Sequence, residues 1–204
     1  MRVLGIDPGL RITGYGCLEA SETGETLVEA GAIRLGLRSA DVIEQSSRSA
    51  AGVSERLVEL DRDFRAILGR LLPRAVAIEA VFAHYKHPAT AIVMGHARGV
   101  LLLAVRQAGL TLIELRPNEV KKSMTGFGHA SKEQMQEAVR GRYGLVQAPS
   151  PPDVADAIAI AACGADRFRL GAAGVSLRSG GRGGAARSVA RLPEHVRVQI
   201  AKSN

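Results

Sequence analysis

The chain opens with Met1–Gly16, MRVLGIDPGLRITGYG, in which a short apolar run ends at Asp7 and Pro8-Gly9 follows at once. Apolar runs of this length that stop at turn residues are typical of buried strands, so we expect a strand over residues 2–7. The aspartate at its end has two interpretations. It either opens a turn, as Asp before Pro-Gly often does, or the strand holds it in place for its chemistry.

Outward from this stretch, the apolar pattern predicts a sheet interleaved with helices. Two further strands, ITGYGCLEA and TLVEAGAIRL, are separated by a short polar turn and indicate an antiparallel meander. Two later apolar runs, AVAIEAVF and TLIEL, indicate buried strands. Helical spacing of apolar residues, with proline or glycine at several ends, predicts helices over residues 41–72, 88–107, 118–124, 131–144 and 153–168. This order predicts an α/β fold with a mixed five-stranded sheet flanked by helices.

The composition is typical of a globular protein, with 46% apolar residues among 204 and no tryptophan. The apolar runs fall well short of the ~20 residues that a membrane span needs, and the N-terminus lacks the pattern of a secretory signal. Two cysteines, Cys17 and Cys163, are too few for a disulfide framework or a zinc site. We therefore expect a reducing, cytoplasmic location.

The net charge of +7 is distributed unevenly along the chain. Residues 167–204 carry eight Lys or Arg and one Glu, whereas the charges of residues 1–166 cancel. We predict a folded domain over 1–166 and a largely disordered basic tail over 167–204, because the tail is rich in Gly, Arg, Ser and Ala and has little to bury. Residues 84–144 carry nine basic and four acidic side chains, which indicates a phosphate-binding surface beside acidic segments.

Four carboxylates stand at positions where exposure to solvent gives no obvious reason for an acidic residue: Asp7, Glu79, Asp153 and Asp156. The first two end apolar strands, and the last two are three residues apart in a helix and so face the same side. If the two strands are neighbours, all four acids converge at one edge of the sheet. Carboxylate ligands without Cys or His favour Mg²⁺ or Mn²⁺, and two such ions ~3.5–4 Å apart promote phosphodiester hydrolysis.

Each acid except Glu79 also has a purely structural explanation. Asp7 fits a Pro-Gly turn, and Asp153 follows Ser150 at the S-x-x-D spacing of a helix start. Asp156 shares the helix-start explanation more weakly. Glu79 is harder to explain in this way, because an unpaired carboxylate on an apolar strand is costly to bury. Taken together, the acids favour a metal cluster.

The chain resembles the RuvC family of Holliday-junction resolvases in five segments that occur in family order: GIDPGLRITGYG, AIEAVF, GHARG, VKKSMTGFGHASK and PPDVADAIAIA. The resemblance covers about residues 1–166 and implies a ribonuclease H-like fold. It also implies that two Mg²⁺ ions, with Mn²⁺ as an alternative, are bound in an active site formed by Asp7, Glu79, Asp153 and Asp156. All four family positions are carboxylates here.

The resemblance extends to residues that would contact DNA. Phe82 matches a family aromatic implicated in base contacts at the junction centre, although on residue type alone it fits a core position equally well. Lys121, Lys122 and Lys132 flank the loop GFGHA and are expected to bind phosphates. The resemblance favours Lys121 and Lys132 over Lys122, and a solvated helix face remains the alternative for each lysine.

The function implied by the resemblance is a Mg²⁺-dependent, structure-selective endonuclease that resolves four-way junction DNA by paired nicks in opposite strands, in recombination and repair. A symmetric homodimer suits the near two-fold symmetry of the junction, and the helix around residues 91–104 either forms that contact or covers the sheet. RuvA and RuvB are the implied partners. Two alternatives stay open: a non-catalytic junction-binding protein, and an actin-like ATP-binding domain with a phosphate loop similar to GIDPGLRITG.

Overall fold

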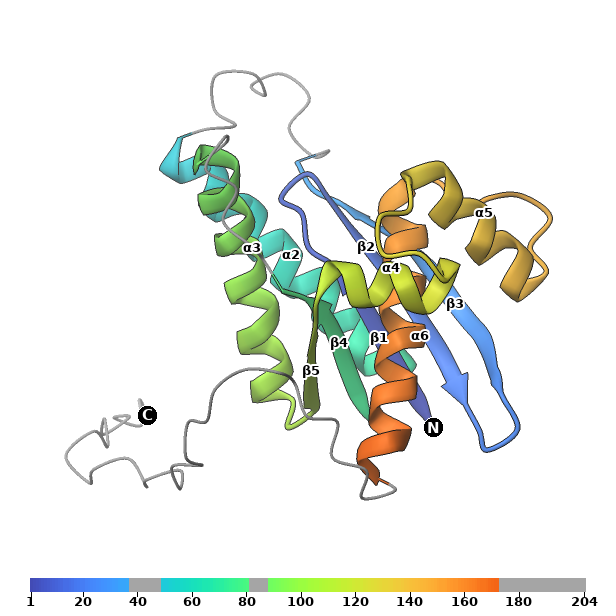
Figure 1. Cartoon of the computed structure of the whole chain (residues 1–204). Coiled ribbons are helices and arrows are strands. Elements are labelled where there is room, and N and C mark those ends of the chain that lie inside the picture. The colour runs from blue at the N-terminus through green and yellow to red at the C-terminus, as the bar shows by residue number, and fades with distance from the viewer. Residues whose placement is uncertain (37–48, 81–87, 173–204) are drawn as a thin grey trace, which may run out of the picture.

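A mixed five-stranded sheet lies at the centre of the computed structural model, which describes residues 1–36, 49–80 and 88–172 (Figure 1). The strand order is β3-β2-β1-β4-β5. The strands are β1 (Arg2–Asp7), β2 (Ile12–Ala20), β3 (Glu25–Arg34), β4 (Ala75–Glu79) and β5 (Thr111–Leu115). The predicted antiparallel meander of β1, β2 and β3 is confirmed, and β4 and β5 extend the sheet in parallel with β1.

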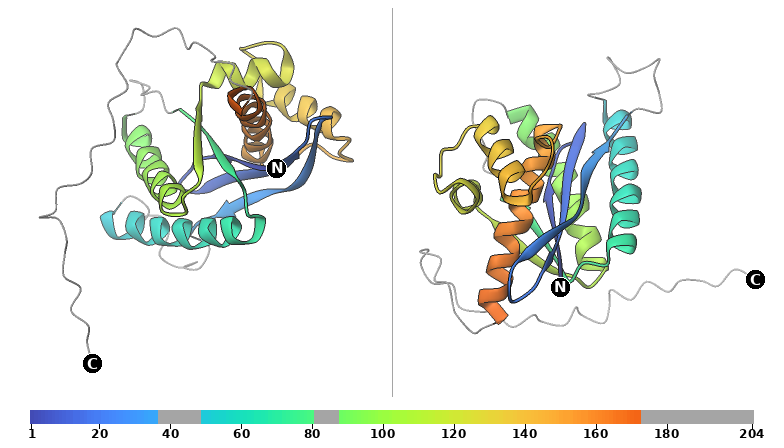
Figure 2. Two further views of the ribbon diagram at one scale, coloured as in Figure 1. Left: turned by 90° about the horizontal axis from the view of Figure 1, so that it is seen from below. Right: turned by 90° about the vertical axis from the view of Figure 1, so that its right-hand side faces the viewer.

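Helices cover both faces of the sheet and make three layers (Figure 2). They are α2 (Ala50–Leu71), α3 (Pro88–Gln107), α4 (Pro117–Thr125), α5 (Lys132–Tyr143) and α6 (Pro152–Ala172). Neighbouring residues of β1 serve opposite faces, as the two-residue period of a strand requires. Val3 packs in the core beneath α6, whereas Leu4 packs in the core formed with α2 and α3, around Phe64 and Leu101.

The helix ends carry the signals that the sequence showed. Ser131 and Gln134 form a capping box at the start of α5. The helix predicted over 41–72 is confirmed from Ala50 onward, with Ser49 as its N-cap, and residues 41–48 lie outside the described residues. The helix over 88–107 has the predicted bounds, and Gly109 follows it with φ +69°.

Close contact between α6 and the sheet depends on small residues. A Cβ added to Gly5 of β1 would stand 2.2 Å from the carbonyl oxygen of Ala157, and one on Gly164 of α6 would stand 2.5 Å from the Cβ of Ala77. Six alanines of α6 are buried: Ala155, Ala157, Ala159, Ala161, Ala162 and Ala165. The absence of larger side chains here lets the helix backbone lie directly on β1 and β2.

The predicted domain boundary at residue 166 is too early. Helix α6 continues to Ala172, and Arg167 donates to the carbonyl oxygen of Glu114 at 2.9 Å. Arg169 likewise donates to the carbonyl oxygen of Ser21 at 3.1 Å. These contacts to distant strand ends keep residues 167–172 in the folded domain, and residues 173–204 lie outside the described part. Among the described helices, none combines the length and apolar character of a membrane span.

Candidate active site

Asp7 and Glu79 end adjacent parallel strands. In the register of β1 and β4, Ile6 stands beside Ile78, so the next residue on each strand is an acid. The two strands are therefore neighbours, which is the condition under which the acids converge. Because the strands run in the same direction, their carboxyl ends bring Asp7 and Glu79 to the same edge of the sheet.

The first turn of α6 brings Asp153 and Asp156 to this edge. Asp7 is the antiparallel partner of Gly14 on β2, and a Cβ on Gly14 would stand 2.0 Å from the carbonyl oxygen of Asp153. The start of the helix therefore lies directly over the strand pair that carries Asp7. Asp156 follows three residues later on the same face of α6.

The charges of the four carboxylates influence one another. Burial raises the pKa of Asp7 well above its usual value, and the charges of Asp156, Glu79 and Asp153 raise it further. The pKa of Glu79 is raised by burial and by Asp156. Burial also raises the pKa of Asp156, and Asp153 adds to that shift. The acids therefore repel one another, as carboxylates that share a site do.

Two of the predicted lysines act on this acidic group. Lys132, at the first position of α5, lowers the pKa of Asp7 and of Asp156. Lys121 of α4 lowers the pKa of Glu79 and of Asp156. Lys122 is not among the groups that shift the pKa of Asp7, Glu79 or Asp156, and its carbonyl oxygen accepts the capping bond from Gly126. Phe82 lies outside the described residues.

The donor set fits a hard divalent cation, although the side chains do not already form a closed ligand shell. Within residues 1–36, 49–80 and 88–172, no three Asp, Glu, His or Cys side chains stand at the spacing of a metal site. The charges of the acids nevertheless influence one another. Their side chains are partly buried and offer only oxygen atoms as ligands. Such oxygen ligands suit Mg²⁺ or Mn²⁺, and a divalent charge would offset the repulsion that raises the pKa of Asp7.

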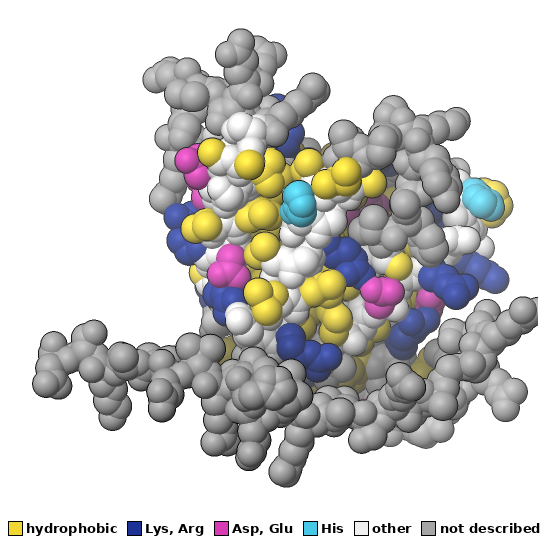
Figure 3. Space-filling model, turned by 90° about the vertical axis from the view of Figure 1, so that its left-hand side faces the viewer, with side chains coloured by type: hydrophobic (Ala, Val, Ile, Leu, Met, Phe, Trp, Pro, Cys, Tyr) yellow, Lys and Arg dark blue, Asp and Glu magenta, His cyan; other side chains and the backbone are white. Residues whose placement is uncertain are grey.

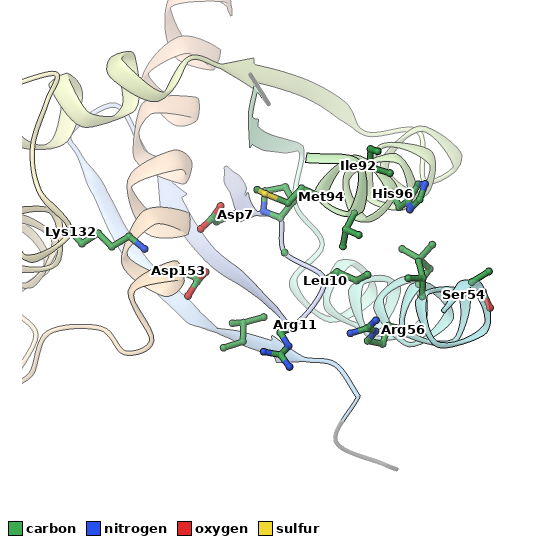
Figure 4. Close-up of a pocket in the computed structure, with 17 residues that line it drawn as sticks. Asp7, Leu10, Arg11, Ser54, Arg56, Ile92, Met94, His96, Lys132 and Asp153 are labelled. Atoms are coloured by element: carbon green, nitrogen blue, oxygen red, sulfur yellow. The ribbon is translucent and has the colours of Figure 1, made fainter. Parts of the chain in front are cut away.

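Two of the acids, Asp7 and Asp153, open into a groove of about 1360 Å³. Asp7, Asp153 and Lys132 point into one end of it (Figure 4). The groove continues past Arg11 in the turn between β1 and β2 to α2 and α3, where its lining includes Leu57 and His96. Sequence reasoning did not single out Arg11, although it lies in the opening motif, four residues after Asp7. It also missed His96, which stands in the GHARG segment.

The chain matches the family model described as crossover junction endodeoxyribonuclease RuvC over residues 3–164. A relative of that description from Rhodopirellula baltica is 44% identical over 162 residues, which is 79% of this chain and 84% of the relative. One from Chloroflexus aggregans is 42% identical over 163 residues, covering 80% of this chain and 92% of the relative.

Solved structures give the same result. Thermus thermophilus RuvC has a TM-score of 0.68 with 33% identity, over 84% of this chain and 97% of that one. The structure of T. thermophilus RuvC with a Holliday junction substrate has a TM-score of 0.67 with 29% identity, over 84% and 97% of the two chains. The yeast mitochondrial resolvase Ydc2, with a TM-score of 0.57 and 14% identity over 80% and 77%, shows the fold alone. The predicted ribonuclease H-like fold is confirmed.

Proposed function

Because the chain belongs to the family of RuvC crossover junction endodeoxyribonucleases, we propose that it resolves Holliday junctions by paired nicks in opposite strands. The observation that carries this proposal is the convergence of Asp7, Glu79, Asp153 and Asp156 at one edge of the sheet, beside Lys121 and Lys132. The same family match favours a nuclease over the actin-like ATP-binding domain that the opening stretch also resembles.

We assign the four carboxylates as the ligands of divalent cations, with Mg²⁺ or Mn²⁺ as the suitable ions. Bound there, a pair of such ions would supply Lewis acidity at the scissile phosphate and would make water more acidic. Asp7 and Glu79 hold their positions because β1 and β4 are buried strands of the sheet. Asp153 and Asp156 hold theirs because α6 is packed on that sheet.

The basic groups around the acids would position the substrate. Lys132 lies at the end of the groove that holds Asp7, where its ammonium group would bind the phosphate that approaches the site. Lys121 would neutralise a neighbouring phosphate. Lys122 is exposed and would add a weaker contact. Cleavage leaves a 5′ phosphate and a 3′ hydroxyl, which a ligase can rejoin.

The symmetry of the substrate supports a homodimer as the active form. A four-way junction has near two-fold symmetry, and a C₂ dimer would present two identical sites to opposite strands. Helix α3 is the candidate contact, since Ile92 and Leu103 on it are 60% and 56% exposed. Figure 3 shows hydrophobic side chains spread over this side of the molecule. RuvA and RuvB remain the proposed partners in branch migration.

A cleavage assay tests the proposed function directly. The purified chain is incubated with a synthetic four-way junction or with linear duplex of the same sequence, with and without Mg²⁺. We expect symmetric nicks in the junction only when Mg²⁺ is present, and we expect Asp7→Asn to bind the junction without cutting it. Equal cutting of duplex would refute structure selectivity. Junction binding by the unchanged chain without any cutting in Mg²⁺ or Mn²⁺ would indicate the non-catalytic alternative.

The basic segment 173–204 is proposed to add DNA affinity that does not depend on sequence. Six of its residues are Lys or Arg and one is Glu, and each phosphate contact adds to the salt dependence of binding. Deleting 173–204 should weaken junction binding and flatten its salt dependence, while the cleavage rate at saturating protein stays unchanged. A lower rate at saturation would assign the segment to the chemistry instead.

A further inference from the structure

A phenylalanine is exposed at the tip of the loop between α4 and α5. Phe127 keeps 59% of its surface in solvent, in a protein with only four phenylalanines. It lies in the GFGHA loop, between Lys121 and Lys132. Single exposed apolar residues need no explanation in general, so the surroundings of this ring decide whether it has a use.

The backbone that leads into the ring is held by hydrogen bonds. The N–H of Phe127 donates to the hydroxyl of Thr125 at 3.1 Å, and that hydroxyl donates in turn to the carbonyl oxygen of Lys121 at 2.8 Å. Gly126 takes the left-handed conformation with φ +76° and caps α4. The ring is thus presented by a defined turn at the end of a helix, which lowers the entropy lost when it binds a ligand.

A second aromatic ring supports the first. The ring of His129 lies 5.8 Å from that of Phe127 between centroids, at an interplanar angle of 69°. This edge-to-face geometry is a favourable arrangement for aromatic pairs. It restricts the phenylalanine without burying it, because more than half of its surface stays exposed.

Two lysines bracket this tip in the chain. Lys121 precedes Phe127 by six residues, and its carbonyl oxygen accepts from Thr125 of the same turn. Lys132 follows Phe127 by five residues and lines the groove together with Asp7. A strand of DNA whose phosphate lies against both lysines would therefore pass close to the tip of the loop. Aromatic rings beside basic grooves are the usual platforms for stacking of nucleotide bases.

We propose that Phe127 is a further DNA-binding residue, which stacks on a nucleotide base of the cleaved strand a few nucleotides from the scissile phosphate. This assignment rests on the proposed nuclease function. It adds a contact on the α4–α5 side of the site, separate from the Phe82 segment. The chemistry required of the ligand is an exposed base face, which an opened junction or a single strand provides.

Affinity for the junction is the first test, measured without divalent ions so that cutting does not interfere. Phe127→Ala should weaken binding about tenfold, since each aromatic–base stack is worth ~1–3 kcal/mol and 1.4 kcal/mol is a factor of ten. Phe127→Leu should lose nearly as much, whereas Phe127→Trp should bind as well as the unchanged protein. Val146→Ala, at a position 94% exposed in another loop, is the matched control and should not change affinity.

The salt dependence of binding separates stacking from charge. Phe127→Ala removes no phosphate contact, so log K against log salt should keep its slope, whereas Lys121→Ala should reduce that slope by about 1. Thermal unfolding of each variant verifies that it folds. Full affinity in a folded Phe127→Ala variant would overturn the proposal, and so would full affinity in Phe127→Leu, since an aliphatic side chain cannot stack.

Fluorescence gives a direct readout, because the protein has no tryptophan of its own. The single tryptophan of Phe127→Trp should be strongly quenched when junction DNA or a single-stranded oligonucleotide binds, as expected for stacking on a base. The single tryptophan of Val146→Trp should not respond. A spectral shift without quenching at position 127 would indicate a contact with sugars and would overturn the assignment. If the unchanged protein cuts the junction but neither fluorescence nor affinity responds at residue 127, this inference fails while the nuclease function stands.

Discussion

The carbonyl oxygen of Asp153 lies so close to Gly14 that a Cβ on that glycine would stand 2.0 Å from it. Gly14 is also the strand partner of Asp7. The missing side chain of one residue therefore lets acids from the two ends of the domain share a site. The tight packing of α6 on β2 is a condition of the proposed chemistry as well as of the fold.

Substituting Gly14 by alanine should damage activity and stability together. The added methyl group collides with the backbone of α6, and overpacking of this kind costs about 1–3 kcal/mol. Displacing Asp153 by about 1 Å should slow junction cleavage on the order of 100-fold. Single-turnover cleavage and thermal unfolding measure the two effects.

Gly69→Ala is the matched control, because nothing lies within 4 Å of that helical position. A gain in stability of up to ~1 kcal/mol is expected there. A Gly14→Ala enzyme that cuts at the normal rate would contradict the assigned role.

Asp7→Asn should stabilise the metal-free protein at neutral pH. The folded state raises the pKa of Asp7 above its usual value of 3.8, so the native protein loses stability as pH rises from about 4 through the raised pKa. The neutral amide removes this penalty, and each kcal/mol recovered raises Tm by about 2–4 °C. Mg²⁺ should then raise the Tm of the unchanged protein more than that of the variant. An equal response to Mg²⁺ would show that Asp7 binds no cation.

Lys132→Gln should shift the pH dependence of cleavage. Lys132 lowers the pKa of Asp7 and of Asp156, so its removal raises both pKa values. The acids must be ionised to hold a cation, and the acidic limb of the pH–rate profile should therefore move to higher pH. The rate at neutral pH should fall about tenfold with the loss of a charged phosphate contact. Lys122→Gln, the matched variant, should leave the limb in place, and a limb unchanged in Lys132→Gln would argue against the coupling.

Tyr143→Phe should lower the free energy of unfolding more than most changes that remove a single atom. The hydroxyl of Tyr143 donates to Glu25 at 2.5 Å, and the Glu25 side chain is only 7% exposed. Removing a hydrogen bond to a buried charge costs about 1.5–3 kcal/mol. Tyr15→Phe provides the comparison, since Tyr15 donates to Glu29, which is 32% exposed, and should cost less. Urea unfolding of both variants decides the order, and equal losses would refute the argument from burial.

Both thiols should be inert in the native protein. Burial raises the pKa of Cys17 and of Cys163 to about 11, so only about one thiol in a thousand is ionised at pH 8. A disulfide reagent such as dithionitrobenzoate should not react until denaturant is added, and two equivalents should then react quickly. Release of one equivalent within minutes in the native state would disprove the burial of that cysteine.

Much of the fold could be predicted because its signals are local. The period of apolar residues, the capping box at Ser131 and the stops at Pro73 and Gly109 depend only on near neighbours in the chain. The end of α6 could not be predicted in this way. Its last turn is held by Arg167 and Arg169, which bond to the carbonyl oxygens of Glu114 and Ser21, and such partners are far away in sequence.

The sequence by itself determined which residue types the site would use: acids that end buried strands, an acidic pair at a helix start and lysines around a glycine-rich loop. Only the tertiary structure decided that these groups meet and that Arg11 and His96 line the same groove. The physical reason is that residue chemistry and periodicity are properties of a short segment. Convergence depends on strand register and on how closely α6 can approach Gly14, and both are set by packing between segments far apart in the chain.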